Sequence, residues 1–135
     1  MLKFLIYCAF ILISSGPDSN TISESPYIIE VQDTVLKHAV YIWLKDDLST
    51  SEKDLFLEKA KALGSIKSVK TLEISKPANT ATRSVTQNDF SYYMEFIFNS
   101  VESHDAYQID VIHKDFVETC KGFWDKVVVY DSVTP

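Results

Sequence analysis

The stretch HDAYQIDVIHKDFVETCKGFWDKVVVYDSV, residues 104–133, contains a helix and a strand that together indicate the fold. At a period of 3.6 residues, one helical face gathers His113, Phe116, Val117, Cys120 and Trp124, and the opposite face is charged. Asp110 is placed to cap this helix, and Gly122 to end it. The β-branched and aromatic run 127–130 predicts a buried strand. His113 is therefore expected in the first turn of a helix, on its core side.

The segments before this stretch predict a further alternation of strands and helices. Residues 34–44 carry apolar side chains on both faces, which is typical of a strand covered on both sides. Ser49 and Glu52 form a capping-box pattern at the start of a helix. The expected order is strand 34–44, helix 50–63, strand 68–75, polar loop 76–88, strand 90–98, helix 100–107, the helix of His113, and strand 127–130.

This order predicts an α+β, ferredoxin-like domain, in which a four-stranded antiparallel sheet carries its helices on one face. The other face would then be bare. Tyr41 and Trp43 on the first strand and the aromatic row at 90–98 make such a face too apolar to lie in water. Two subunits packed sheet to sheet would cover it, so the sequence predicts a homodimer.

Residues 1–16 have the layout of a secretory signal peptide: Lys3, an apolar run from Phe4 to Ile13, and then small residues. The apolar run is shorter than the roughly 20 residues needed to span a bilayer. A short membrane-proximal anchor or a mispredicted start is the alternative. We expect a cleaved signal, export to the periplasm or the extracellular space, and no stable membrane anchor afterwards. Residues 17–33 are polar and predict a flexible leader, and residues 34–135 a single domain.

Composition excludes several function classes. A net charge of −6 without a basic stripe argues against a nucleic-acid partner, and three glycines leave no glycine-rich phosphate loop. Once the predicted signal has removed Cys8, Cys120 is the single cysteine, so neither an internal disulfide nor a cysteine-based zinc site is expected. Cys120 is expected in the core.

The chain resembles the stress-responsive dimeric α/β-barrel (Dabb) domain family from about Val35 to Val133. The resemblance is carried by LKHAVYIWLKD at 36–46, SYYMEFIFNSVESHDAYQ at 91–108 and IHKDFVETCKGFWDKVVVYD at 112–131. It implies a dimer in which two sheets form a barrel. The C-terminal half is also similar to a plant polyketide cyclase of this family.

The similarity to that cyclase implies that His113 is a general base acting on a linear polyketide, helped by Tyr107 and His38. The family usually has His-Pro shortly before the helix histidine, where this chain has Asp110 and Val111. From the residues alone, an imidazole in a helix N-terminus is a neutral proton acceptor near pH 7, and His38 could hold its other ring nitrogen. Alternatively, the two histidines only tie the helix to the sheet. No cofactor and no metal ion is expected.

Other polar residues are weaker candidates. His104 is expected on the second helix, partly exposed and without a partner. Asp110 and His113 are three residues apart, a spacing at which both could bind one metal ion. Asp110 is instead expected to cap the helix of His113. If Glu95 is buried it would need a partner, for which Lys37 and Lys70 are candidates, and an ion pair is favoured over catalysis.

Two function classes remain open. One is an exported homodimer that binds a small apolar or aromatic ligand or is purely structural. The other is a cofactor-free enzyme, similar to a polyketide cyclase or a lyase, that uses His113 with Tyr107 and His38. A pocket of roughly 300 Å³ or more that faces His113 and Tyr107 would favour a ligand, and a filled core would favour the structural class.

Overall fold

The computed structural model describes residues 34–135, so the predicted signal peptide at 1–16 and leader at 17–33 lie outside the described residues. The elements occur in the predicted order: β1 (Leu36–Leu44), α1 (Thr50–Ala62), the 3-10 turn η1 (Leu63–Ser65), β2 (Thr71–Ser75), β3 (Tyr92–Phe98), α2 (Val101–Ile109), α3 (Val111–Cys120) and β4 (Trp124–Val133). The strands form one antiparallel sheet in the order β2-β3-β1-β4. The predicted ferredoxin-like α+β fold is confirmed. No helix within residues 34–135 is long and apolar enough to cross a membrane.

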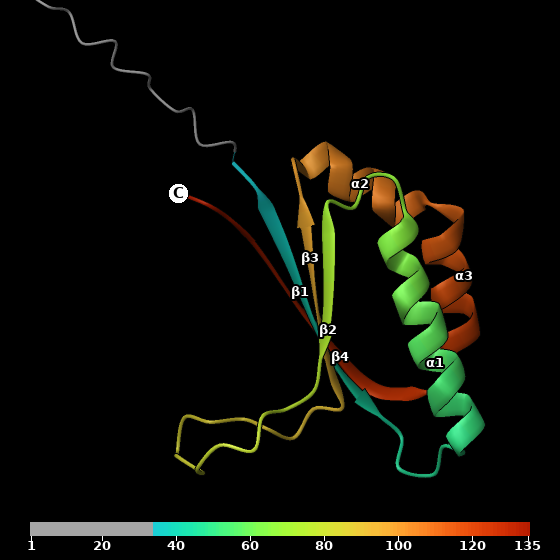
Figure 1. The fold of residues 1–135 in the computed structure, drawn as a ribbon, viewed down its shortest axis with the longest axis vertical. Coiled ribbons are helices and arrows are strands. Elements are labelled where there is room, and N and C mark those ends of the chain that lie inside the picture. Colours follow the sequence, from blue (N-terminus) through green and yellow to red (C-terminus); the bar gives the residue numbers. More distant parts are fainter. Residues whose placement is uncertain (1–33) are drawn as a thin grey trace, which may run out of the picture. The chain divides into compact units, whose positions relative to one another are not determined.

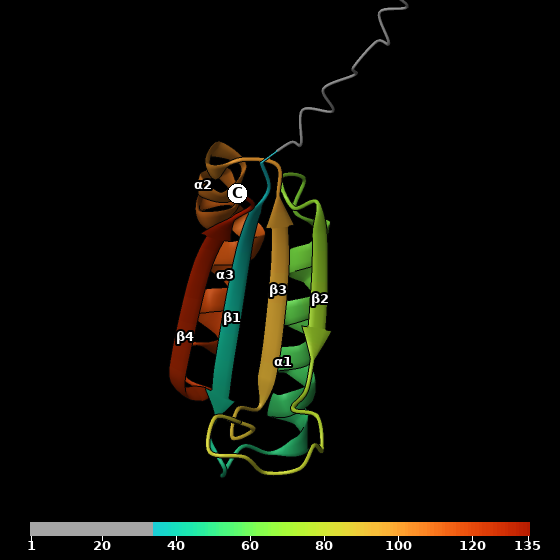
Figure 2. The same ribbon diagram turned by 90° about the vertical axis from the view of Figure 1, so that its left-hand side faces the viewer.

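All three helices lie on one side of the sheet, and the other side is open (Figures 1 and 2). The alternation along β1 explains why. Its helix-facing side chains Leu36, His38, Val40 and Ile42 are at most 6% exposed. The side chains between them are exposed or half-buried. Both faces of β1 are largely apolar, as predicted. Within residues 34–135, however, the helices cover only one of these faces.

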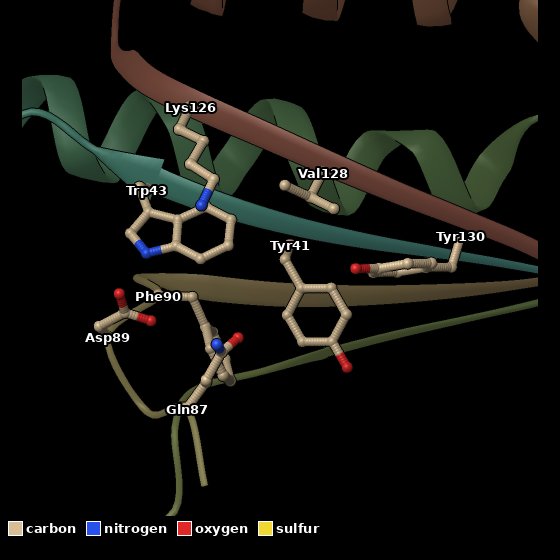
Figure 3. Close-up of a pocket in the computed structure, with 8 residues that line it drawn as sticks. All are labelled: Tyr41, Trp43, Gln87, Asp89, Phe90, Lys126, Val128 and Tyr130. Carbon is tan, nitrogen blue, oxygen red and sulfur yellow. The ribbon is translucent and has the colours of Figure 1, made fainter. Parts of the chain in front are cut away.

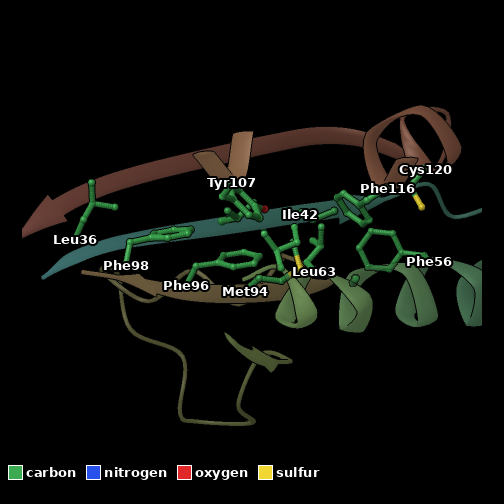
Figure 4. Close-up of a cluster of buried hydrophobic side chains, with 13 residues drawn as sticks. Leu36, Ile42, Phe56, Leu63, Met94, Phe96, Phe98, Tyr107, Phe116 and Cys120 are labelled. Carbon is green, nitrogen blue, oxygen red and sulfur yellow. The ribbon is translucent and has the colours of Figure 1, made fainter. Parts of the chain in front are cut away.

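The core lies between β1, β3 and the helices, where Met94, Phe96 and Phe98 of β3 face Tyr107 and Phe116 (Figure 4). Phe56 of α1 is fully buried, with its ring centroid 5.4 Å from that of Tyr92 and 5.8 Å from that of Phe116. It therefore joins α1 to both the sheet and α3. Cys120 is buried as predicted, and this burial raises the pKa of its thiol to about 11.

Local side-chain hydrogen bonds begin each helix where the sequence predicted. Ser49 and Glu52 form the capping box of α1. The Ser100 hydroxyl accepts from the Ser103 N–H at the start of α2, and the Asp110 carboxylate accepts from the Ile112 N–H at 2.8 Å. Asp110 is thus a helix cap, as expected. It is the single residue between the end of α2 at Ile109 and the start of α3 at Val111.

The prediction of a buried C-terminal strand was wrong. β4 begins at Trp124, so Trp124 is not part of the helix face to which it was assigned, and Val117 on that face is 37% exposed. The three residues after Cys120 turn the chain into the strand. Within residues 34–135, β4 is an edge strand that pairs only with β1, which leaves Val129 43% and Tyr130 63% exposed.

Aromatic side chains dominate the open face. Tyr41 lies 4.8 Å from Tyr93 and 5.2 Å from Phe90 between ring centroids, and Lys126 Nζ lies 4.2 Å from the Trp43 ring centroid. Figure 3 shows Tyr41, Trp43, Phe90 and Lys126 among the residues that line a groove of about 300 Å³. The long loop between β2 and β3 bends toward this same side of the sheet (Figure 1).

Glu95 also lies on this open face and is half-buried, and its partner is neither Lys37 nor Lys70. Its carboxylate instead accepts a hydrogen bond of 2.7 Å from the Tyr93 hydroxyl. The two residues are two positions apart on β3, so their side chains stand on the same face of the strand.

Candidate functional site

A pocket of about 160 Å³ lies between the helix-facing side of the sheet and helices α2 and α3. Most of its lining is apolar, and its polar members are His38, Tyr107, Gln108 and His113. The volume is below the roughly 300 Å³ that we took to favour a ligand. It is close to the ~150 Å³ of an apolar cavity that is known to admit benzene. The pocket is therefore large enough for a single aromatic ring or a short aliphatic chain.

His113 is the third residue of α3, half-buried, and it faces this pocket. Its Nδ1 lies 3.1 Å from the carbonyl oxygen of Gln108, at the end of α2. A carbonyl oxygen can only accept, so Nδ1 carries the proton and Nε2 is the acceptor of the neutral ring. Burial lowers the pKa of His113, and the neighbouring His38 and His104 lower it further. The neutral acceptor form therefore prevails at neutral pH.

Tyr107 stands between the two histidines that the sequence singled out. Its ring centroid lies 4.5 Å from that of His113 and 6.0 Å from that of His38. The side chain is 2% exposed, and this burial raises the pKa of its hydroxyl. Within residues 34–135, no hydrogen-bond partner occupies that hydroxyl. Tyr107 is thus a protonated donor at the wall of the pocket.

His38 on β1 does not hold the second ring nitrogen of His113, contrary to one expectation. Its Nδ1 bonds Asp131 Oδ1 at 2.7 Å, because His38 and Asp131 are directly opposite each other in the β1–β4 register. Burial lowers the pKa of His38 and outweighs the opposing effect of Asp131. Asp131 was missed because the strand pairing that places it here is visible only in the folded sheet.

His104 also has partners, contrary to the sequence prediction. Its side chain is 15% exposed, and its ring centroid lies 5.0 Å from that of His38 and 5.4 Å from that of Phe98. Its Nε2 lies 3.0 Å from the Gln108 side-chain amide. The contact depends on how α2 crosses the end of the sheet, which helical periodicity does not reveal.

Comparison with known proteins agrees with this geometry. The stress-responsive A/B barrel domain (Dabb) model matches residues 36–134. The chain belongs to the Dabb family. Olivetolic acid cyclase of Cannabis sativa is 24% identical to it over 96 residues, which cover 71% of this chain and 93% of the cyclase.

Two solved structures share the fold of this Dabb domain, and one of them is described as ferredoxin-like. Hydroxynitrile lyase from Passiflora edulis superimposes with a TM-score of 0.65 at 18% identity, over 75% of this chain and 94% of the lyase. A dimeric ferredoxin-like protein from Thermobifida fusca superimposes with a TM-score of 0.62 at 10% identity, over 76% of this chain and 93% of that protein. The predicted family and fold are both confirmed.

The Dabb fold brings His113, Tyr107 and His38 to one pocket from three different elements. α3 supplies the proton acceptor, α2 supplies the hydroxyl donor, and β1 supplies a histidine oriented by Asp131. Such a set can accept a proton from a bound molecule while donating a hydrogen bond to an oxygen of the same molecule.

The two lowered histidine pKa values predict how stability of this Dabb domain depends on pH. Both pKa values lie below the ordinary 6.5, so below pH 6.5 the unfolded chain binds more protons than the folded one. This stability contribution is complete above pH 6.5 and is lost as the pH falls through the folded-state pKa values. Urea unfolding between about pH 7.5 and about pH 5 should show this loss, and His113→Gln should reduce its slope. A constant free energy of unfolding over this window would contradict the prediction.

Proposed function

We propose that this Dabb domain is an enzyme that binds a small, largely apolar carbonyl compound in the pocket and moves a proton on it, with His113 as the acid–base group. The observation that carries the proposal is the hydrogen bond from His113 Nδ1 to the Gln108 carbonyl. It leaves Nε2 as the proton acceptor in a largely apolar pocket, next to the Tyr107 hydroxyl, which has no hydrogen-bond partner within residues 34–135. Export, predicted from residues 1–16, remains part of the proposal.

The proposed step follows from the positions of these groups. Nε2 of His113 takes a proton from the carbon beside the carbonyl. The electron pair of that C–H bond forms a carbon–carbon double bond, and the π electrons of the carbonyl move to its oxygen, which gives an enolate. The Tyr107 hydroxyl donates a hydrogen bond to that oxygen and stays protonated, because burial raises its pKa. The imidazolium then returns its proton to the product. Gln108 stabilises the imidazolium through Nδ1 throughout the step.

Pocket size and the relatives support this reaction class. A volume of about 160 Å³ suits one ring and a carbonyl group rather than a long chain. A cyclase and a hydroxynitrile lyase are among the proteins that share this fold, which supports enzymatic use of the pocket. A purely structural domain is the second candidate, and the observation in its favour is that the pocket is smaller than most ligand sites.

Acetophenone is a suitable probe, because it combines one ring with a carbonyl and exchangeable methyl protons. The domain should accelerate exchange of these protons in D₂O, followed by NMR. His113→Gln keeps a donor for the Gln108 carbonyl but has no proton acceptor, so exchange should fall at least about 100-fold while the fold is kept. His113→Ala should in addition cost about 1–3 kcal/mol of stability, because the Gln108 carbonyl loses its donor.

Lys114→Gln is the matched control, because it introduces the same residue at the next position of α3, where the side chain is exposed and does not line the pocket. This variant should exchange acetophenone protons like the unmodified domain. Binding of acetophenone without enhanced exchange would limit the pocket to ligand binding. If the domain neither bound acetophenone nor accelerated exchange of its protons, the purely structural role would be favoured.

We further propose that the domain is a homodimer closed by its open sheet faces. The open face presents Tyr41, Trp43 and Tyr130 to the groove beside the sheet, and such an apolar surface is normally covered. The relative from Thermobifida fusca is dimeric, which supports the same assembly here. The long loop between β2 and β3 bends to this side and would contact the second copy (Figure 1).

A further inference from the structure

Three side chains that could ligate a metal ion meet beside the pocket, at the end of the sheet where α2 crosses it. His38 comes from β1, His104 from α2 and Asp131 from β4. One donor atom of each lies within 4.8 Å of the others. His104 and Asp131 do not line the pocket, and neither takes part directly in the proposed proton-transfer step.

We propose that His38, His104 and Asp131 bind a divalent transition-metal ion of the Zn²⁺ type. Donors bound at about 2.1 Å to one ion lie at most about 4.2 Å apart, so small side-chain rotations would close the site. Two imidazoles with one carboxylate suit Zn²⁺ and its first-row neighbours, whereas Mg²⁺ and Ca²⁺ prefer sites made of oxygen ligands.

The contacts among these residues suit an ion at this position. Imidazole nitrogens and carboxylate oxygens are both ligands of Zn²⁺ in proteins. The short bond between His38 and Asp131 shows that a carboxylate oxygen and an imidazole already converge there, at 2.7 Å.

The surroundings also supply outer-sphere support and access. His104 Nδ1 lies 3.2 Å from Asp105 Oδ1, and an N–H donated there would leave Nε2 free for the ion once the Gln108 amide turns aside. Asp105 and Asp131 together balance a charge of +2. The Asp131 side chain is 49% exposed, so water can reach the site and complete the coordination shell.

The competing explanation is that these residues only pack and pair. In that case the two histidine rings stack at 5.0 Å and His38 forms an ion pair with Asp131. His104→Phe separates the two explanations, because phenylalanine keeps an aromatic ring in the stack but has no donor atom. The proposed proton transfer uses His113, Tyr107 and the Gln108 carbonyl, none of which is a proposed metal ligand, so each proposal can be right without the other.

The test is Zn²⁺ titration of the tag-free protein after EDTA treatment and dialysis, followed by calorimetry, with Co²⁺ absorption as a second readout. We expect one ion per chain. Loss of an outer-sphere partner typically weakens metal binding 10–100-fold, so loss of a direct ligand in His104→Phe should weaken it at least about 100-fold. Asp131→Asn, which keeps an oxygen for His38 but removes the charge, should also weaken binding.

His113→Gln is the matched control, because it removes a histidine that is not among the three ligands. It should bind Zn²⁺ like the unmodified protein while losing acetophenone exchange, so the two proposals fail separately. Less than one ion per chain, or equal affinity in His104→Phe and the unmodified protein, would overturn the metal site. Equal weakening by His113→Gln and His104→Phe would also overturn it, by placing the ion in the pocket instead.

Discussion

Replacing Phe56 by alanine should lower the free energy of unfolding by about 3–5 kcal/mol. The side chain is fully buried, and its ring contacts Tyr92 on β3 and Phe116 on α3. Its removal would leave a cavity where three elements meet, which none of them can fill by a local rotation. Because small domains are stable by about 5–15 kcal/mol, this single change would remove a large part of the total.

Urea unfolding at one fixed protein concentration measures this effect, since the stability of an oligomer depends on concentration. Val85→Ala is a suitable control, because Val85 is 83% exposed in the loop between β2 and β3. Its expected cost is below about 0.5 kcal/mol. If Phe56→Ala also lowered the free energy of unfolding by less than about 0.5 kcal/mol, the packing of Phe56 would not be important for the stability of the domain.

Val128→Asp should convert the proposed homodimer into a folded monomer. Val128 lies on the open face of β4, among the side chains of the groove in Figure 3. In a monomer the new carboxylate would remain in water, but in the dimer it would be buried without a partner, twice per dimer. Such burial costs about 3–5 kcal/mol, so the dissociation constant should rise at least about 100-fold.

Sedimentation velocity at tens of micromolar protein distinguishes the two states. Val101→Asp introduces the same charge at a residue that is 52% exposed at the start of α2, and it should remain dimeric. An unmodified protein that sediments as a folded monomer would rule out the dimer. A dimeric Val128→Asp would show that the subunits meet at another surface.

The order of the elements and the starts of the helices could be predicted from the sequence because they depend on local interactions. Ser49, Ser100 and Asp110 each accept a backbone N–H within the next three residues, as a cap requires. Successive side chains of a strand point to opposite faces, so the sequence of β1 alone divided its residues into two faces before the neighbouring strands were known. The resemblance to the Dabb family then pointed to His113, Tyr107 and His38, which do line one pocket.

Tertiary structure alone decided which groups each of these side chains meets. The β1–β4 register sets Asp131 opposite His38, and the path of α2 lays His104 against the same ring. These partners are far apart in the sequence, so no periodic pattern connects them. Burial was also decided at this level: β4 has the composition of a buried strand, yet as the edge strand it stays largely exposed in the single chain. Local propensity selects the element, and only packing against distant segments determines how much of that element is removed from water.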